Sequence, residues 1–215
     1  MKANKEGGAM EIIKDGKTFT IRLVSTDERS LGVDEGEHQY VTAFHYDIVA
    51  FEIDSDACEE VGRQTVGEIN SYYLDGSGAY ESSSYGMLPN ALVEEADDID
   101  QDVFNIAQAL YSNQDTLFNL GAAILDTFYI DYVEVKEGWR GHDVGLLAAE
   151  TVIRSHGPNA NIALIPKQGE GESKLKLTHY WKRLGLKKLP VKGFGFALWH
   201  NASKNRKRFT ARKAA

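Results

Sequence analysis

Apolar and polar side chains alternate over the first third of the chain, which is typical of strands with one face on a core. Residues 10–23 carry this alternation on both sides of Asp15 and Gly16, a pair that favours a two-residue turn. These residues are therefore predicted to form a β-hairpin. Runs rich in valine, isoleucine, tyrosine and phenylalanine predict two further strands, over 40–53 and 65–74.

The spacing becomes helical in the middle of the chain. One apolar stripe predicts a helix from about Val103, behind a group of aspartates, and another predicts a short helix with Asp115 as its N-cap. The stripes are Val103, Ile106, Ala107 and Leu110, and Leu117, Leu120 and Ile124. The polar residues 26–37 and the Ser-, Gly- and Tyr-rich residues 71–86 are predicted to be loops.

A strand–helix–strand succession follows. A nearly continuous apolar run over 128–135 precedes a helical stripe over 144–155 and a short apolar run over 161–165. This order predicts a right-handed βαβ unit with parallel strands. A helix over 173–184 should end at Gly185, a residue suited to a helix C-terminus. The last two strands are expected at 186–191 and 194–200.

The composition fits one globular domain of 215 residues, 42% hydrophobic and 26% charged. There is no apolar stretch of roughly 18 residues and no signal core, so we expect a cytoplasmic protein without a membrane span. Cys58 is the single cysteine, which excludes an intramolecular disulfide and a multi-cysteine metal site. The histidines show no close ligand pairing, and no metal is expected.

Charge divides the chain in two. Residues 1–135 hold 27 acidic and 7 basic residues, a net charge of −20, whereas residues 136–215 hold 5 acidic and 17 basic, a net charge of +12. The whole chain carries −8. This asymmetry favours a cationic partner for the first part and an anionic one for the second, although solvated faces would give the same pattern.

The segment from Glu137 to Gly145 joins a strand to a helix and is the most informative stretch. A helix N-terminus offers unpaired N–H groups at the positive end of a dipole, which binds anions, phosphate above all. Gly141 and Gly145 allow the backbone to approach a ligand, and Arg140 offers a planar fork for phosphate oxygens. The segment fits neither the dinucleotide fingerprint nor the P-loop.

The C-terminal part resembles the GNAT superfamily of N-acetyltransferases, in which a strand leads through Arg/Gln-x-x-Gly-x-Gly/Ala into a helix. The chain here reads V-E-V-K-E-G-W-R-G-H-D-V-G-L-L, then N-I-A-L-I-P, H-Y-W-K-R-L-G-L and F-G-F-A-L-W-H. The resemblance covers about residues 126–200 and includes the order of the strands and helices.

The resemblance implies an α+β fold with a central mixed, mostly antiparallel twisted sheet, one parallel and splayed strand pair, and flanking helices. It implies a single acetyltransferase domain over 10–203, followed by a basic tail over 204–215. The family has two helices after its first strand, where this chain has only a polar loop. An inserted helical segment, at about 76–127, precedes the central strand instead.

The resemblance also implies acetyl-CoA as cosubstrate and a cationic primary amine as acceptor. Backbone amides of 140–145 would hold the pyrophosphate, and the pantetheine arm would lie between the strands at 128–135 and 161–165. A backbone N–H near Val135 would polarise the thioester carbonyl. The implied cofactor-binding residues are Val133, Val135, Arg140, Gly141, His142, Asp143, Val144 and Gly145.

Three residues are candidate catalytic groups. Alternation along the strand places Asp131 on one face with Tyr129, Val133 and Val135, and Glu134 on the other. The resemblance favours Asp131 over Glu134 as the general base, and either carboxylate fits a solvated strand position as well. Trp181 stands where the family has its acid tyrosine, so the neighbouring Tyr180 is either the general acid or a packing residue.

Two further features leave alternatives open. Asp143 stands where the family has glycine, and its carboxylate either repels phosphate or caps the helix beginning at Val144. Together with Trp181, this favours a second interpretation, a catalytically inactive GNAT-fold binding or interaction module. The basic residues 204–213 are either a solvated tail or a contact for nucleic acid.

Overall fold

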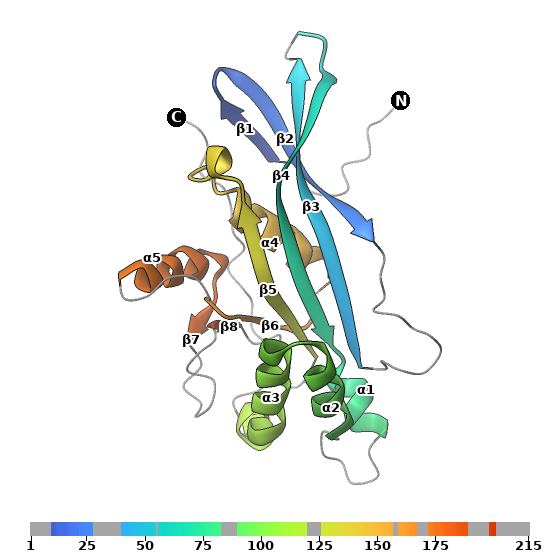
Figure 1. Cartoon of the computed structure of the whole chain (residues 1–215). Coiled ribbons are helices and arrows are strands. Elements are labelled where there is room, and N and C mark those ends of the chain that lie inside the picture. Colours follow the sequence, from blue (N-terminus) through green and yellow to red (C-terminus); the bar gives the residue numbers. More distant parts are fainter. Residues whose placement is uncertain are drawn as a thin grey trace.

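The computed structural model describes residues 10–27, 40–54, 56–82, 90–119, 126–156, 159–166, 172–188 and 198–200. The strands in these ranges form one sheet in the order β1-β2-β3-β4-β5-β6-β8-β7 (Figure 1). They are β1 (Met10–Lys14), β2 (Lys17–Asp27), β3 (Val41–Asp54), β4 (Glu59–Leu74), β5 (Thr127–Val135), β6 (Asn161–Leu164), β7 (Lys187–Lys188) and β8 (Leu198–His200). The helices are α1 (Gly76–Ser82), α2 (Asn90–Ile99), α3 (Gln101–Asn119), α4 (Val144–His156) and α5 (Glu172–Trp181), with the 3-10 helices η1 (Glu137–Trp139) and η2 (Lys182–Leu184).

The N-terminal half of the sheet is antiparallel from β1 to β5. The predicted turn between β1 and β2 is confirmed, because Asp15 and Gly16 both take positive φ angles, 53° and 75°. Such angles match the twist of a tight hairpin. β4 begins at Glu59 and is longer than predicted, so β3 and β4 form a long hairpin that extends away from the helices (Figure 1).

The predicted βαβ unit is also confirmed. Residues 127–130 of β5 pair in parallel with residues 161–164 of β6, and α4 makes the crossover between them. Further on, α5 continues into η2, which ends at Gly185 with a φ of 82°. This left-handed residue at the helix end is the C-terminal signal that the sequence predicts.

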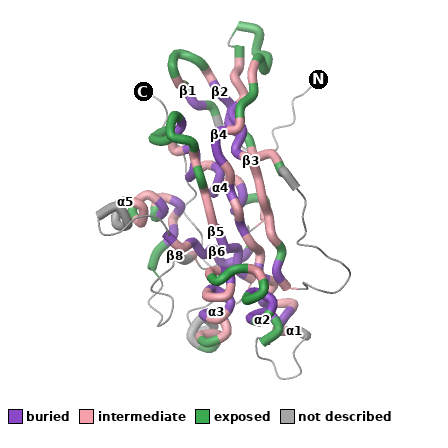
Figure 2. The backbone as a smooth tube through the Cα atoms, viewed as in Figure 1, coloured by how far each residue is buried: buried purple, intermediate pink, exposed green. Residues whose placement is uncertain are grey.

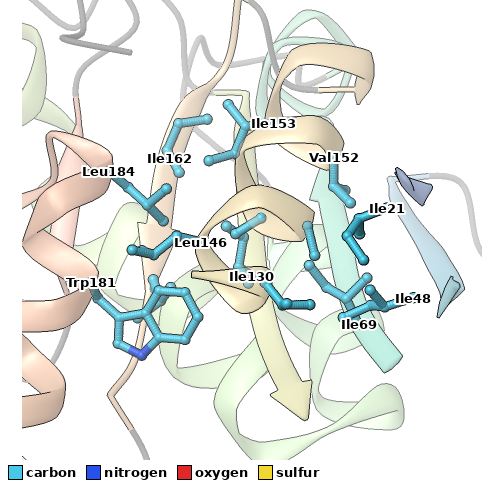
Figure 3. Close-up of a cluster of buried hydrophobic side chains, with 14 of the residues drawn as sticks. Ile21, Ile48, Ile69, Ile130, Leu146, Val152, Ile153, Ile162, Trp181 and Leu184 are labelled. Carbon is cyan, nitrogen blue, oxygen red and sulfur yellow. The ribbon is translucent and has the colours of Figure 1, made fainter. Parts of the chain in front are cut away.

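Two apolar clusters cover the two faces of the sheet. Phe128 and Ile130 pack with α4, whereas Tyr129, which points the opposite way along β5, packs with α2 and α3. Figure 2 shows the buried positions along the strands and helices. In Figure 3, the side chains of Trp181 and Leu184 lie close to Leu146 of α4. The predicted α+β fold, with a mixed sheet, one parallel pair and an inserted helical segment, is therefore confirmed.

The inserted segment differs in detail from the prediction. Residues 76–82, expected in a loop, form α1, because the Asp75 carboxylate accepts the N–H of Gly78 at 2.7 Å and holds the helix start. The stripe expected to begin a second helix at Asp115 continues α3 without a break to Asn119. Residues 120–125 and 28–39 lie outside the described ranges.

Helix α2 is not predicted from the sequence, and some of the aspartates assigned to the start of the next helix belong to it. The carboxylate that begins α3 is that of Asp100, which accepts the N–H of Asp102 at 2.8 Å. None of the helices in the described ranges combines the length and the apolar character that crossing a bilayer requires.

Glu95 of α2 ties the inserted segment to the sheet. Its carboxylate accepts the N–H of Tyr40 at 3.0 Å and that of Val41 at 2.6 Å, at the beginning of β3. Glu95 is 9% exposed and Val41 is 4% exposed, so the hydrogen bond between them is shielded from bulk water. The carboxylate thus supplies the acceptors that these backbone donors need.

Replacing Glu95 with alanine should lower the free energy of unfolding by about 2–4 kcal/mol, because it leaves buried donors unsatisfied. Urea denaturation of the variant measures this loss. Glu94→Ala is the matched control, since Glu94 is the exposed neighbour on the same helix and should change stability by less than about 0.5 kcal/mol. Equal losses for the two variants would contradict the role given to Glu95.

Candidate active site

A β-bulge in β5 opens the sheet next to the βαβ unit. Ile130 pairs with Ser71 and Tyr132 pairs with Asn70, so Asp131 is an extra residue with no partner position on β4. A bulge bends its strand and increases the local twist. The parallel pairing with β6 stops at Ile130, and the two strands part beyond this point.

The bulge also reverses the faces of the strand. Val133 and Val135 pack on the α4 side with Ile130, whereas Tyr129 and Asp131 lie together, the tyrosine hydroxyl donating to the carboxylate at 3.1 Å. The prediction that Asp131 shares a face with Val133 and Val135 is therefore wrong. Regular alternation fails because the extra residue shifts the pattern by one.

A cavity of about 260 Å³ lies between the end of β5, the start of α4 and the end of α5. A smaller cavity of about 60 Å³ continues from it into the gap between β5 and β6. Val133, Leu177 and Trp181 line both, so the two form one groove. The larger cavity is lined by Val133, Glu134, Val135, Trp139, Arg140, Gly141, Asp143, Val144, Gly145, Leu177, Tyr180 and Trp181.

The first turn of α4 contributes Val144 and Gly145 to the lining of this groove. Val144 and Gly145 are buried, and within the described part of the chain no hydrogen-bond partner exists for their N–H groups. Buried donors at a helix end normally require a partner. Arg140 lies beside them and donates its Nε to the carbonyl of Val135 at 2.9 Å, which fixes the guanidinium at the rim.

Backbone donors of β5 face the gap as well. The N–H of Lys136 donates to the carbonyl of Val66 in β4 at 2.8 Å. Because successive N–H groups of a strand point to opposite edges, those of Val135 and Val133 point away from β4. They face the side on which β6 has already diverged.

Tyr180 lines the larger cavity next to α4. Its hydroxyl accepts the N–H of Leu146 at 3.2 Å, and burial raises the pKa of the hydroxyl to about 12. The side chain therefore stays protonated near neutral pH. Neighbouring positions of a helix point about 100° apart around its axis. Tyr180 and Trp181 nevertheless both line the larger cavity.

Each of the two β5 carboxylate residues lines one of the two cavities, Glu134 the larger and Asp131 the smaller. Glu134 is exposed and accepts the hydroxyl of Tyr132 at 2.5 Å. Asp131 is half-buried, and one of its carboxylate oxygens lies within 4.8 Å of one oxygen each of Asp100 and Asp102 at the start of α3. The three aspartates form an acidic cluster next to the gap.

The structure brings most of the predicted cofactor-binding residues to one groove. Val133, Val135, Arg140, Gly141, Asp143, Val144 and Gly145 line it, whereas His142 is exposed and is not part of its lining. Sequence reasoning missed Trp139 of η1 and Arg183 of η2. Trp139 is a large apolar residue within the mostly polar and glycine-containing segment 137–145, and this contrast could have predicted that it lines the site. The basic residues 204–213 lie outside the described ranges.

Two solved structures resemble this chain. A KacTA–DNA complex contains a chain 12% identical, with a TM-score of 0.40 over 86% of this chain and 94% of that one. The mosquito arylalkylamine N-acetyltransferase like 5b is 16% identical, with a TM-score of 0.36 over 70% of this chain and 71% of that one. No family model and no curated protein matches the sequence. Likenesses this distant carry no argument about activity.

Proposed function

We propose that this protein is an N-acetyltransferase, which moves an acetyl group from acetyl-CoA to a primary amine. One observation carries the proposal: buried, unpartnered N–H groups at the start of α4 open into a groove that continues between the parted strands β5 and β6. Such a groove suits a long ligand with an anionic end and a narrow apolar arm. The GNAT resemblance of residues 126–200 supports the same ligand.

The anionic end fits a diphosphate. The N–H groups of Val144 and Gly145 lie at the positive end of the α4 dipole, where phosphate oxygens are favourable guests. The fork of Arg140 adds a cation at the rim. Val133, Leu177 and Trp181 supply the apolar wall that an alkyl-amide arm needs.

The parted strands fit the reacting end. A thioester supplies an activated acyl group, and its carbonyl needs donors as negative charge develops on the oxygen. The N–H groups of Val133 and Val135 face the gap and are held by the strand, so they need no rearrangement to act. The resemblance implies this role for the end of the strand.

A cationic acceptor suits the other face of the sheet. Asp47, Glu68 and Glu134 lie directly opposite one another on β3, β4 and β5, and Asp131 lies nearby at the gap. Like charges in register destabilise a sheet by repulsion, and a bound cation relieves it. An amine that approaches from this side would reach the gap without crossing the anion-binding end.

Proton transfer requires a base and an acid near the gap. The amine must lose its proton before it attacks, and we assign this role to Asp131 in preference to Glu134, because Asp131 lines the gap itself. Tyr180, protonated near neutral pH, is the proposed acid for the departing thiolate. Its hydroxyl retains its proton for donation while it accepts the N–H of Leu146.

A binding module without catalysis is the second candidate function. Trp181 is 7% exposed at the position of the family's acid, and its indole cannot protonate a thiolate. This candidate predicts CoA binding without release of thiol from acetyl-CoA in the presence of any amine. Turnover with any acceptor would exclude it.

Isothermal calorimetry with CoA and with inorganic pyrophosphate tests the anion site. We expect CoA to bind with a Kd below about 1 mM, which corresponds to a binding free energy more favourable than about −4 kcal/mol. Arg140→Ala should weaken this binding about tenfold. Arg154→Ala is the matched control, because Arg154 is exposed at the far end of the same helix. No heat at millimolar CoA would exclude the acetyltransferase. A thiol-release assay with polyamines, aminoglycosides and lysine peptides then tests for turnover.

A further inference from the structure

Asp143 places a negative charge at the edge of the proposed anion site. It is the residue before α4, its φ of 60° lies in the left-handed region, and it lines the larger cavity. An unpaired carboxylate here would repel a diphosphate and would compete with it for the N–H groups of Val144 and Gly145. An anion site with this carboxylate in its lining needs a cation that neutralises it.

The guanidinium of Arg183 is this cation. Its Nη1 donates to Oδ1 of Asp143 at 2.6 Å, and its Nη2 donates to Oδ2 at 2.5 Å. Both carboxylate oxygens are thus engaged in the bidentate geometry that gives the strongest ion pairs. Among the described residues the carboxylate makes no hydrogen bond to the first turn of α4, so the prediction that Asp143 caps this helix is wrong.

Arg183 is held in place by its own surroundings. It belongs to η2, directly after α5, and its neighbour Leu184 is fully buried against the core around α4. Its guanidinium carbon lies 5.9 Å from the centroid of the Tyr180 ring. Tyr180 and Arg183 are three positions apart, so both side chains reach the start of α4 from one face of the helix end.

We propose that Arg183 is the positioning residue that makes the start of α4 a diphosphate site. It neutralises Asp143 and keeps the carboxylate turned from the N–H groups, which then remain free for the anion. Arg183 is not a member of the cavity lining and acts through Asp143. The inference rests on the proposed function and adds to it a residue 40 positions away in sequence.

Five proteins test the proposal: the wild type, Arg183→Gln, Asp143→Asn, the double variant and Arg183→Lys. Calorimetry with CoA and with inorganic pyrophosphate gives the affinity of each, and thermal unfolding gives its stability. Arg183→Gln should weaken binding about tenfold or more, since it leaves an unpaired carboxylate in the lining of the proposed anion site. Asp143→Asn, which tolerates the left-handed backbone, should bind as tightly as the wild type or tighter.

The double variant gives the sharpest result. It should recover the affinity that Arg183→Gln loses, because no carboxylate is left to neutralise. Arg183→Lys, which keeps the charge without the fork, should recover only part of the affinity that Arg183→Gln loses. Both single variants break the same ion pair, so a purely structural bridge would lower their melting temperatures and affinities alike.

The outcomes separate this proposal from the function on which it rests. Equal losses of affinity in Arg183→Gln and Asp143→Asn, with no recovery in the double variant, would overturn the positioning role and leave the acetyltransferase standing. A wild type that binds neither CoA nor pyrophosphate would overturn both. Loss in Arg183→Gln with recovery in the double variant supports the proposal.

Discussion

Gly145→Val is expected to remove CoA binding, with a loss of affinity of about a hundredfold or more, about 2.7 kcal/mol. A Cβ at this position would lie 3.1 Å from the hydroxyl oxygen of Tyr180 and 3.5 Å from methyl groups of Val133 and Val135. The two further methyl groups of valine would occupy the groove where the diphosphate and its arm are proposed to meet. Valine has a higher helix propensity than glycine, so the substitution should not weaken α4 through propensity.

Titration calorimetry with CoA measures this effect, and Gly138→Val is its matched control. Gly138 lies in the same segment, is exposed, and has no atom within 4 Å of the position of an added Cβ. The control should bind CoA as the wild type does. A Gly145→Val protein with an unchanged Kd would show that the ligand does not approach the start of α4.

Asp131→Asn should lower kcat by about a hundredfold or more while the Kd for CoA stays unchanged. Asparagine keeps an oxygen that can accept the hydroxyl of Tyr129, so the bulge should persist. What is lost is the group that accepts the amine's proton. The measurement is kcat with the best acceptor of the thiol-release assay, together with CoA titration of the same preparation.

Glu134→Gln is the comparison for this variant, because Glu134 is the other carboxylate of β5 near the groove. Its carboxylate is exposed and accepts the hydroxyl of Tyr132, so a change of no more than about threefold in kcat is expected, well below the effect of a general base. The reverse order, with Glu134→Gln the more damaged enzyme, would transfer the role of base from Asp131 to Glu134.

The βαβ unit could be predicted because its signals are local. The apolar run of β5, the stripe of α4 and the apolar run of β6 each carry their own period, and the chain order then fixes a parallel pair. The role of the segment from Arg140 to Gly145 as a source of backbone donors could be predicted for the same reason. A loop that enters a helix leaves the first N–H groups of the helix without partners, whatever the rest of the fold.

The faces of β5 could not be predicted, because a bulge is specified by the partner strand. Nothing in residues 127–135 alone shows that Asp131 has no position opposite it on β4. The partner of Asp143 was hidden for a similar reason, since Arg183 is 40 residues away and is one of many basic residues near the C-terminal end. Helix α2 was missed because its buried Glu95 interrupts the apolar stripe.

The extra residue in β5 gives one strand two chemically unlike sides at its C-terminal end. The side chains of Val133 and Val135 pack on the α4 side, whereas Asp131 bonds to Tyr129 and Glu134 bonds to Tyr132 on the other face of the strand. A single inserted amino acid thereby separates two binding surfaces. Ligands of opposite charge can bind on adjoining faces of β5 and meet only at the gap between β5 and β6.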